Sequence, residues 1–224
     1  MTLVTYRKLS IHKILFLILL LILFFSFYTS IHAQSRNENF ILGFNVTGGM
    51  NDVLHRSGSE EGKTVNWKPG IMAGGGIFLE NMLTSHFGIH SGLYYAYHET
   101  ELEFGDTPDA QLTSRNHSII IPLYLVSSFG NNVRFDILYG LTYMHIFYNT
   151  MSNDNDSTNG IQFINYNQFG FGLQLRLSFA LNRFTYIYAG PHGQFYFSNV
   201  IDSTDWCDYM YNIQLEIGML FKTF

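Results

Sequence analysis

The sequence predicts an all-β fold, an eight-stranded antiparallel up-and-down β-barrel that spans a membrane, and three observations point to it. Only 13% of the residues are charged whereas 17% are aromatic, and a soluble domain carries about twice that charged fraction. Apolar and polar residues alternate along much of the chain, which is the periodicity of a strand. The connections between these segments are long and short in turn. A membrane barrel accounts for all three, because its outer wall meets lipid and its two ends carry long loops and short turns.

The start of the chain predicts an export signal. Basic residues precede an apolar run over residues 14–28, and small residues follow before Ala33 and Gln34. This order is typical of a signal peptide, and we expect cleavage between Ala33 and Gln34. A transmembrane anchor is the alternative, but the run is shorter than the roughly 20 residues that a spanning helix needs. We therefore expect a cleavable signal peptide over residues 1–33 and an outer-membrane barrel domain over residues 34–224.

Five segments show the strand alternation most clearly, beginning at Phe40, Phe87, Phe135, Phe169 and Ile213. Each has one apolar face and one face of Gly, Gln, Thr and charged residues. In a soluble sandwich the polar face would meet water and be rich in Lys and Glu. Short polar residues and glycine suit a crowded barrel lumen instead. Three less regular strands complete the predicted eight, over residues 71–80, 118–128 and 184–192.

The predicted connections alternate in length, which a β-sandwich would not explain. Long outer loops and short periplasmic turns produce this alternation in a barrel, and an even number of strands places both termini in the periplasm. Aromatic residues flank the long connections, as a girdle at the outer headgroups would. The long connections are expected over residues 49–68, 98–115, 148–160 and 193–208, and the girdle at Tyr94, Tyr95, Tyr97, Phe147, Tyr148, Phe195, Tyr196 and Phe197.

A short motif resembles a known family. Residues 118–126 read Ser-Ile-Ile-Ile-Pro-Leu-Tyr-Leu-Val, and a short turn and a strand with Tyr139-Gly140 follow. This pattern resembles the PorT-type outer-membrane barrel domain of Bacteroidetes, over about residues 39–224. The resemblance implies an eight-stranded barrel in the cell outer membrane, with one family member tied to protein secretion. It implies no catalytic residue.

Two positions depart from the regular barrel pattern. Pro122 lies inside a predicted strand and lacks an N–H, so it predicts a bulge or a local break in pairing. Outer-membrane barrels commonly end on an aromatic residue in phase with the lipid-facing residues. The apolar phase of the last strand ends at Phe221, so the terminal Phe224 is out of phase. Either a bulge near Lys222 restores the phase, or Phe221 is the last lipid-facing aromatic.

Six ionisable residues fall on the polar faces of the predicted strands and are expected in the lumen. An eight-stranded barrel is just wide enough for side chains to fill it, and charges there must pair because an unpaired buried charge is costly. We expect a structural network of ion pairs and hydrogen bonds that closes the lumen, with a narrow polar conduit as the alternative. The members are His90, Arg134, Asp136, Arg176, Glu216 and Lys222.

No motif in the sequence predicts an enzyme, a cofactor or a metal site. His86 and His90 share one predicted strand but stand four residues apart, about 13 Å, too far to share a zinc ion. A serine-hydrolase Gly-x-Ser-x-Gly motif is absent. A loose cluster near the predicted outer rim keeps a rim-located hydrolase or acyltransferase open as an alternative: His98, Glu99, Glu101 and Asp106.

Two functions follow from the predicted barrel. A closed lumen leaves the extracellular loops as the functional surface, which predicts a structural or interaction protein that contacts outer-membrane lipid and binds protein partners through its loops. The alternative is a narrow channel, or an outer-membrane component that assists transport or secretion. A net charge of −5 and a pI of about 5.9 exclude nucleic acid as a partner. We expect a monomer without a cofactor.

Overall fold

The computed structural model describes the barrel strands and part of their connections. In this part of the chain there are nine strands and no helix, and thus no helix long and apolar enough to cross a bilayer. The predicted signal peptide and Phe224 lie outside the described residues. The described residues are 40–56, 65–104, 111–130, 132–153, 156–159, 165–200 and 207–222.

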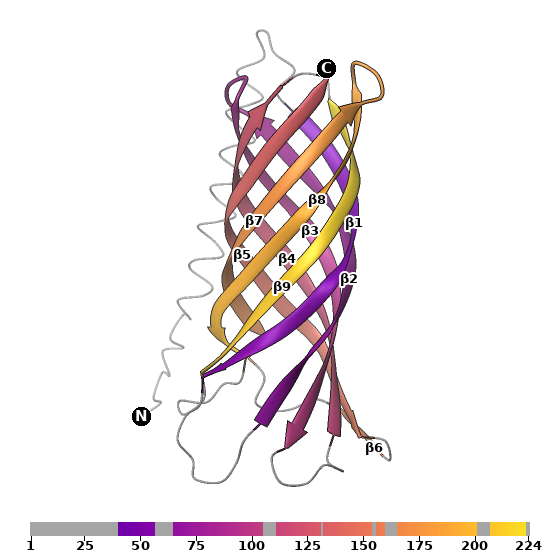
Figure 1. The fold of residues 1–224 in the computed structure, drawn as a ribbon, viewed down its shortest axis with the longest axis vertical. Coiled ribbons are helices and arrows are strands. Elements are labelled where there is room, and N and C mark those ends of the chain that lie inside the picture. The colour runs from indigo at the N-terminus through magenta and orange to yellow at the C-terminus, as the bar shows by residue number, and fades with distance from the viewer. Residues whose placement is uncertain are drawn as a thin grey trace, which may run out of the picture. The chain divides into compact units, whose positions relative to one another are not determined.

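Eight strands form the wall of a closed antiparallel barrel, as predicted, and each predicted segment falls on one of them (Figure 1). The ninth, β6, is short and extends the sheet beside β5 at one end. The bounds are β1 (Phe40–Arg56), β2 (Val65–Met82), β3 (Phe87–Phe104), β4 (Gln111–Phe129), β5 (Val133–Asn153), β6 (Asp156–Asn159), β7 (Asn167–Ala180), β8 (Thr185–Asn199) and β9 (Cys207–Lys222).

The wall follows the order β1-β2-β3-β4-β5-β7-β8-β9, and β9 pairs with β1 to close it. A path that starts at Ile41 and passes from each residue to its direct partner on the next strand goes once around the wall. It returns to β1 at Asn51 rather than at Ile41. With eight strands, this offset from residue 41 to residue 51 tilts the strands by about 40° from the barrel axis. The resulting interior is narrow enough for side chains to fill.

The two ends of the barrel differ in their connections. Residues 83–86 and 181–184 form short turns at the end where Phe40 and Lys222 lie, which we name the turn end. The connection between Phe129 of β4 and Val133 of β5, at the same end, is also short. At the opposite end, the loop end, the strands run further than the sequence predicts, and the expected loop over residues 98–115 is largely strand. The prediction is wrong there because polar residues lie on both faces of the strands, with the buried Leu102 as an apolar exception. Glu101 faces outward and Thr100 inward, so the apolar alternation that marks a strand disappears while the pairing continues.

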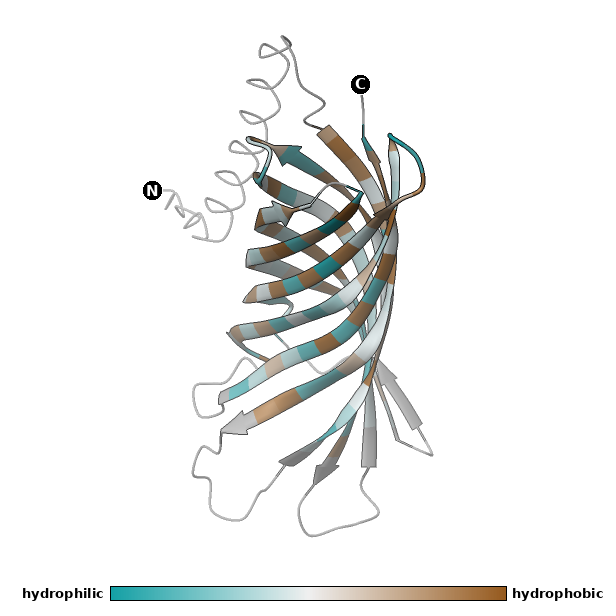
Figure 2. Ribbon diagram, turned by 45° about the horizontal axis from the view of Figure 1, so that its top comes forward, coloured by the Kyte–Doolittle hydropathy of each residue, from teal (hydrophilic) through white to brown (hydrophobic). Residues whose placement is uncertain are grey.

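Hydrophobic and hydrophilic residues alternate along the strands (Figure 2). The large apolar side chains among them are exposed on the outside of the barrel. Val46, Ile71 and Ile77 are each more than 60% exposed. Exposing one large aliphatic side chain to water costs about 1.5–3 kcal/mol, and such residues surround the whole wall. A lipid environment removes that cost, so the predicted apolar-out arrangement is confirmed.

Aromatic residues gather on the outer wall toward the loop end, as a girdle does. Two of the residues predicted there belong to the lumen instead: Tyr196 is fully buried and Tyr94 stacks against Phe78 inside the barrel. Both residues occupy inward positions in the alternation of their strands. The alternation is hard to recognise in the sequence there, because aromatic residues stand at inward and outward positions alike. The outward members are Tyr95, Tyr97, Phe147, Tyr148, Phe195 and Phe197.

Pro122 interrupts the ladder between β3 and β4, as predicted. The pairing of these strands passes from Ser91↔Leu123 directly to Tyr94↔Ile120. The Ser91 hydroxyl donates to the Pro122 carbonyl over 2.8 Å and replaces part of the missing pairing. A proline in a membrane strand is tolerated here because a side chain satisfies the freed backbone group.

Beyond the girdle, β1 and β2 are no longer paired. Their pairing ends at Asn51↔Gly70, after which β1 continues beside β9 and β2 beside β3. Pro69, which has no N–H to donate, occupies the point where β2 leaves β1. The Trp67 indole donates to the Asp208 carboxylate over 3.0 Å and joins β2 to β9 across this separation.

Candidate functional site

The candidate site is the polar interior of the turn-end half of the barrel, and its centre is Glu80 of β2. This carboxylate is fully buried. Arg176 donates to its Oε1 over 2.5 Å, and Arg134 donates to its Oε2 over 3.3 Å. A single buried carboxylate would be costly, and two guanidinium groups compensate its charge.

A second carboxylate, Asp136, completes the arrangement. Arg134 Nε donates to its Oδ1 over 2.6 Å, and Arg176 Nε donates to its Oδ2 over 2.9 Å. Two carboxylates and two guanidinium groups therefore alternate in a ring without net charge. We name Glu80, Arg134, Asp136 and Arg176 the ion-pair ring.

The ion-pair ring crosses the lumen from wall to wall. Glu80 belongs to β2 and Arg176 to β7, and four strand steps separate these strands in either direction around the barrel. Strands so placed face each other across the axis. Both Arg176 and Glu80 are inaccessible to solvent, so the ring ties opposite walls together.

Aromatic side chains pack next to the ring, and glycines on the inner wall make room for them. The outer end of the Phe78 ring lies at Gly43, where a Cβ would overlap it. In the same way the Tyr124 hydroxyl lies over Gly172. His90 stacks on Tyr124 at 5.9 Å between centroids. Small inner residues thus serve the packing of large ones, which is the role that the glycine-rich polar faces predicted.

The six predicted lumen residues all lie on inward faces, but the structure divides them into three groups. Arg134, Asp136 and Arg176 belong to the ion-pair ring, and His90 Nδ1 lies 3.1 Å from Glu80 Oε1. Glu216 lies apart, accepting from the Tyr188 hydroxyl over 2.6 Å with His192 Nδ1 at 3.3 Å. Lys222 lies at the turn end, where its ammonium donates to the Tyr186 hydroxyl over 3.0 Å.

Sequence reasoning missed Glu80, the residue on which the ring depends. Its strand shows no clean alternation, because Met72 and Phe78 share the inward face with Glu80 and hide the polar phase. The signal that would have found it is charge. An acidic residue in the phase opposite to Ile77 and Leu79 must point into the lumen and needs partners there.

Polar side chains continue from the ion-pair ring toward the loop end and contact one another. His192 Nε2 lies 3.1 Å from the Tyr124 hydroxyl, and its Nδ1 lies 2.9 Å from Gln214 Nε2. A cavity beside them, lined also by Thr47 and Glu216, has a volume of about 10 Å³, which is near the minimum for one water molecule.

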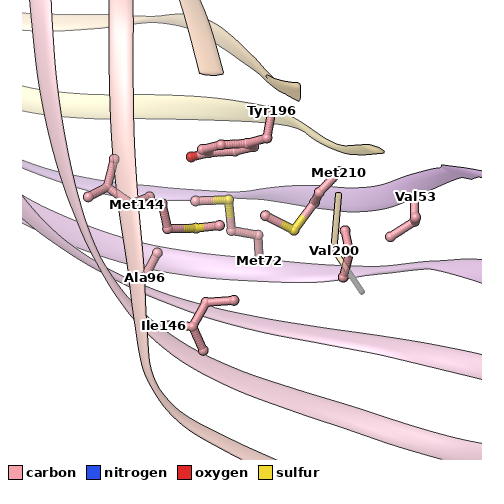
Figure 3. Close-up of a cluster of buried hydrophobic side chains, with 9 residues drawn as sticks. Val53, Met72, Ala96, Met144, Ile146, Tyr196, Val200 and Met210 are labelled. Carbon is pink, nitrogen blue, oxygen red and sulfur yellow. The ribbon is translucent and has the colours of Figure 1, made fainter. Parts of the chain in front are cut away.

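The loop-end half of the lumen holds an apolar layer that the sequence did not predict (Figure 3). The expectation of a polar lumen is therefore only partly right. The layer is a cluster of buried hydrophobic residues, with Trp67 and Tyr94 packed against it. Its members are Val53, Met72, Ala96, Ile120, Met144, Ile146, Tyr196, Val200 and Met210.

Of the four rim residues that left an enzyme possible, the three that the structure describes do not form a cluster. His98 is buried in the lumen near the Ser118 hydroxyl at 3.2 Å. Glu99, its neighbour, faces outward and accepts from Arg115 over 3.0 Å. Glu101 also faces outward, and Asp106 lies outside the described residues. Within the described ranges, no three His, Cys, Asp or Glu side chains are placed to hold a metal ion.

Comparison with known proteins agrees with this architecture. A family model described as outer membrane protein beta-barrel domain matches residues 32–223. No curated protein matches the chain in sequence. Among solved structures, the outer membrane protein OprG from Pseudomonas aeruginosa is similar with a TM-score of 0.52 at 12% identity, covering 83% of this chain and 95% of OprG.

Two further structures are similar at lower scores. Neisserial surface protein A gives a TM-score of 0.45 at 9% identity, over 82% of this chain and 97% of that protein. The outer membrane protease OmpT from Escherichia coli gives 0.42 at 7% identity, over 85% and 99%. The comparisons indicate no enzymatic activity for this chain.

The closed eight-stranded wall, its apolar outer surface and the match over nearly the whole chain lead to one assignment. This small barrel is an outer-membrane protein in contact with membrane lipid, and it belongs to the outer membrane protein beta-barrel domain family.

Proposed function

We propose that the barrel is a closed scaffold of the outer membrane whose loop end binds protein partners, and that it is neither a pore nor an enzyme. The observation that carries this proposal is the ion-pair ring. Two guanidinium groups and two carboxylates join opposite walls without net charge, and an ion crossing the lumen would have to break those pairs. Separating a buried pair leaves uncompensated charges, at a cost of about 3–5 kcal/mol.

The loop end is then the surface available for function. Strands β2 to β5 extend beyond the girdle there and present outward polar side chains such as Glu99, Glu101 and Arg115. Segments beyond a rigid scaffold commonly carry binding function. In the membrane, long loops face the exterior and short turns the periplasm, which would expose this end to partners outside the cell.

Conductance measurement tests the closed lumen. The purified full-length protein in a planar lipid bilayer should give no steady unitary current at high salt. A matched variant, Arg176→Met with Glu80→Gln and Asp136→Asn, removes the strongest pairs and should raise the frequency of brief openings. A robust unitary current from the wild type would overturn the closed scaffold and favour the narrow channel.

A PorT-type role in secretion is the second candidate, favoured by the motif Ile121-Pro122-Leu123 followed by Tyr139-Gly140. Deletion of the gene and comparison of the secreted proteins by mass spectrometry tests it. Loss of a set of secreted proteins, restored by the wild-type gene, supports a secretion component. An unchanged secreted set would remove this candidate and leave the scaffold.

Processing at the N-terminus belongs to the same proposal. The export signal over residues 1–33 should be removed between Ala33 and Gln34, so that N-terminal analysis of the outer-membrane protein finds Gln34 first. A chain that retains residues 14–28 would instead carry an uncleaved anchor. Light scattering in detergent should give the mass of a monomer.

A further inference from the structure

Three methionines from different strands meet in the apolar layer of the lumen. Met72 belongs to β2, Met144 to β5 and Met210 to β9, and each is at most 5% exposed. Around the wall, three strand steps separate β2 from β5 and β5 from β9, and two separate β9 from β2. The three side chains therefore approach the barrel axis from three sides, and Figure 3 shows their thioether ends turned toward one another.

A histidine without a complete set of partners lies beside them. His98 is paired directly with Met72 across β2 and β3 and shares its inward face. Its side chain is buried, its Nε2 lies 3.2 Å from the Ser118 hydroxyl, and its Nδ1 has no hydrogen-bond partner among the described residues. A buried ring nitrogen without a partner costs free energy, so this nitrogen is free to bind a ligand.

The chemistry of these four side chains selects one class of ion. Thioether and imidazole groups are soft or borderline ligands without charge, and thioethers favour Cu(I) over hard cations. None of these four side chains carries the oxygen ligands that hard cations such as Ca²⁺ and Mg²⁺ require. The buried carboxylate of Asp208, on the same strand as Met210, accepts a hydrogen bond from the Trp67 indole over 3.0 Å. A monovalent ion also brings less charge into an apolar layer than a divalent one.

We propose that Met72, Met144, Met210 and His98 form a binding site for a soft monovalent cation of the Cu(I) and Ag(I) class. The three thioethers supply a trigonal set of sulfur ligands, and the imidazole Nδ1 supplies a nitrogen from the neighbouring strand. This site is independent of the scaffold role, because the ion-pair ring lies in the other half of the lumen.

Competition with a chelator tests the site. The full-length protein, purified in detergent and freed of metal, is mixed under reducing conditions with Cu(I) held by bathocuproine disulfonate. We expect the absorbance of the chelate to fall by about one equivalent of Cu(I) per barrel, because the four ligands form one site. A barrel that leaves all Cu(I) on the chelator would overturn the proposal.

Conservative variants assign the ligands. Met72→Leu, Met144→Leu and Met210→Leu keep side-chain volume and the fold, which heat-modifiable gel mobility verifies. Each should weaken Cu(I) binding at least about tenfold, since even outer-shell changes lower metal affinity by that factor. Met50→Leu is the matched control, because Met50 faces outward on β1 and is 40% exposed. Equal Cu(I) affinity in all four variants would mean that the methionines only pack.

Two spectroscopic measurements do not depend on these variants. In wild-type protein with ¹³C-labelled methionine methyl groups, Ag(I) should shift the signals of the lumen methionines and leave that of Met50 in place. X-ray absorption of the Cu(I)-loaded barrel should show sulfur neighbours and an imidazole nitrogen, and His98→Gln should remove only the nitrogen. Uniform shifts of all methionine signals, or oxygen-only coordination, would contradict the site.

Discussion

The two halves of the lumen obey the same inward phase but are filled in different ways. Toward the turn end, Glu80 and Arg176 are fully buried and compensate each other. Toward the loop end, Met72 and Met144 are also buried and belong to a layer of apolar side chains, with the polar His98 beside Met72. An ion-pair ring has few good geometries, whereas unbranched thioethers adapt to irregular gaps. The comparison teaches that a narrow barrel can be closed by a rigid electrostatic crosslink in one half and by adaptable packing in the other.

The largest difference between the halves should appear when one charge is removed. Arg176→Ala leaves Glu80 and Asp136 buried with one guanidinium between them. We expect a loss of about 3–5 kcal/mol in the free energy of unfolding, measured by urea titration of the barrel in lipid vesicles. Glu80→Gln in the same chain should recover part of the loss. A cost below about 1 kcal/mol, the range of surface pairs, would mean that the ring is not a crosslink.

Removing apolar volume from the loop-end half should lower the free energy of unfolding by less. The size of the loss depends on the volume of the substituted side chain. Met144→Ala leaves a cavity in the methionine layer, for which we expect a cost of about 2–5 kcal/mol. Met144→Leu conserves volume and should cost less than about 1.5 kcal/mol. The same urea titration measures both. Equal costs for the two variants would contradict the view that close packing stabilises the methionine layer.

Adding a side chain at an inner-wall glycine tests the contact between these glycines and the aromatic residues next to the ion-pair ring. Gly172→Val places methyl groups where the Tyr124 hydroxyl lies, and we expect a cost of about 1–3 kcal/mol. Gly48→Ala is the matched control, because its added Cβ would meet no atom closer than 4.0 Å. Near-ultraviolet circular dichroism should report the displaced tyrosine only in the first variant. An unchanged spectrum and stability in Gly172→Val would show that the tyrosine has room to move.

The wall of this barrel could be predicted from sequence, and much of its filling could not. Alternation at period two depends on the solvent of each face, so the lipid-facing Phe135 and Leu141 reveal their strand without knowledge of any partner. The partners of an inward residue come from the opposite wall. Nothing near Glu80 in sequence indicates Arg176 on the facing strand, and nothing near Met72 indicates the two methionines that meet it.

The same dependence on solvent explains where the strand ends were misjudged. Once a strand passes the girdle, water replaces lipid outside, so the outward face becomes polar, and polar residues also lie on the inward face. Thr113 and Ser114 point to opposite sides of β4, yet neither is apolar enough to mark a face. The pairing of β3 with β4 continues there, held by backbone hydrogen bonds that do not depend on the side-chain pattern.

The smallest effect should come from an ion pair outside the barrel, and it sharpens the comparison with the ion-pair ring. Glu99 and Arg115 lie 3.0 Å apart on the outer surface of β3 and β4, but Arg115 is 49% exposed. Water already solvates both charges, so Arg115→Met should leave the free energy of unfolding almost unchanged. The cost should shrink further in high salt, because exposed charges are screened within roughly 10 Å at 0.1 M. The cost of Arg176→Ala should barely change with salt, since no counterion reaches a fully buried pair. If salt weakened both variants' effects equally, the ion-pair ring would be accessible to solvent and the lumen would not be closed there.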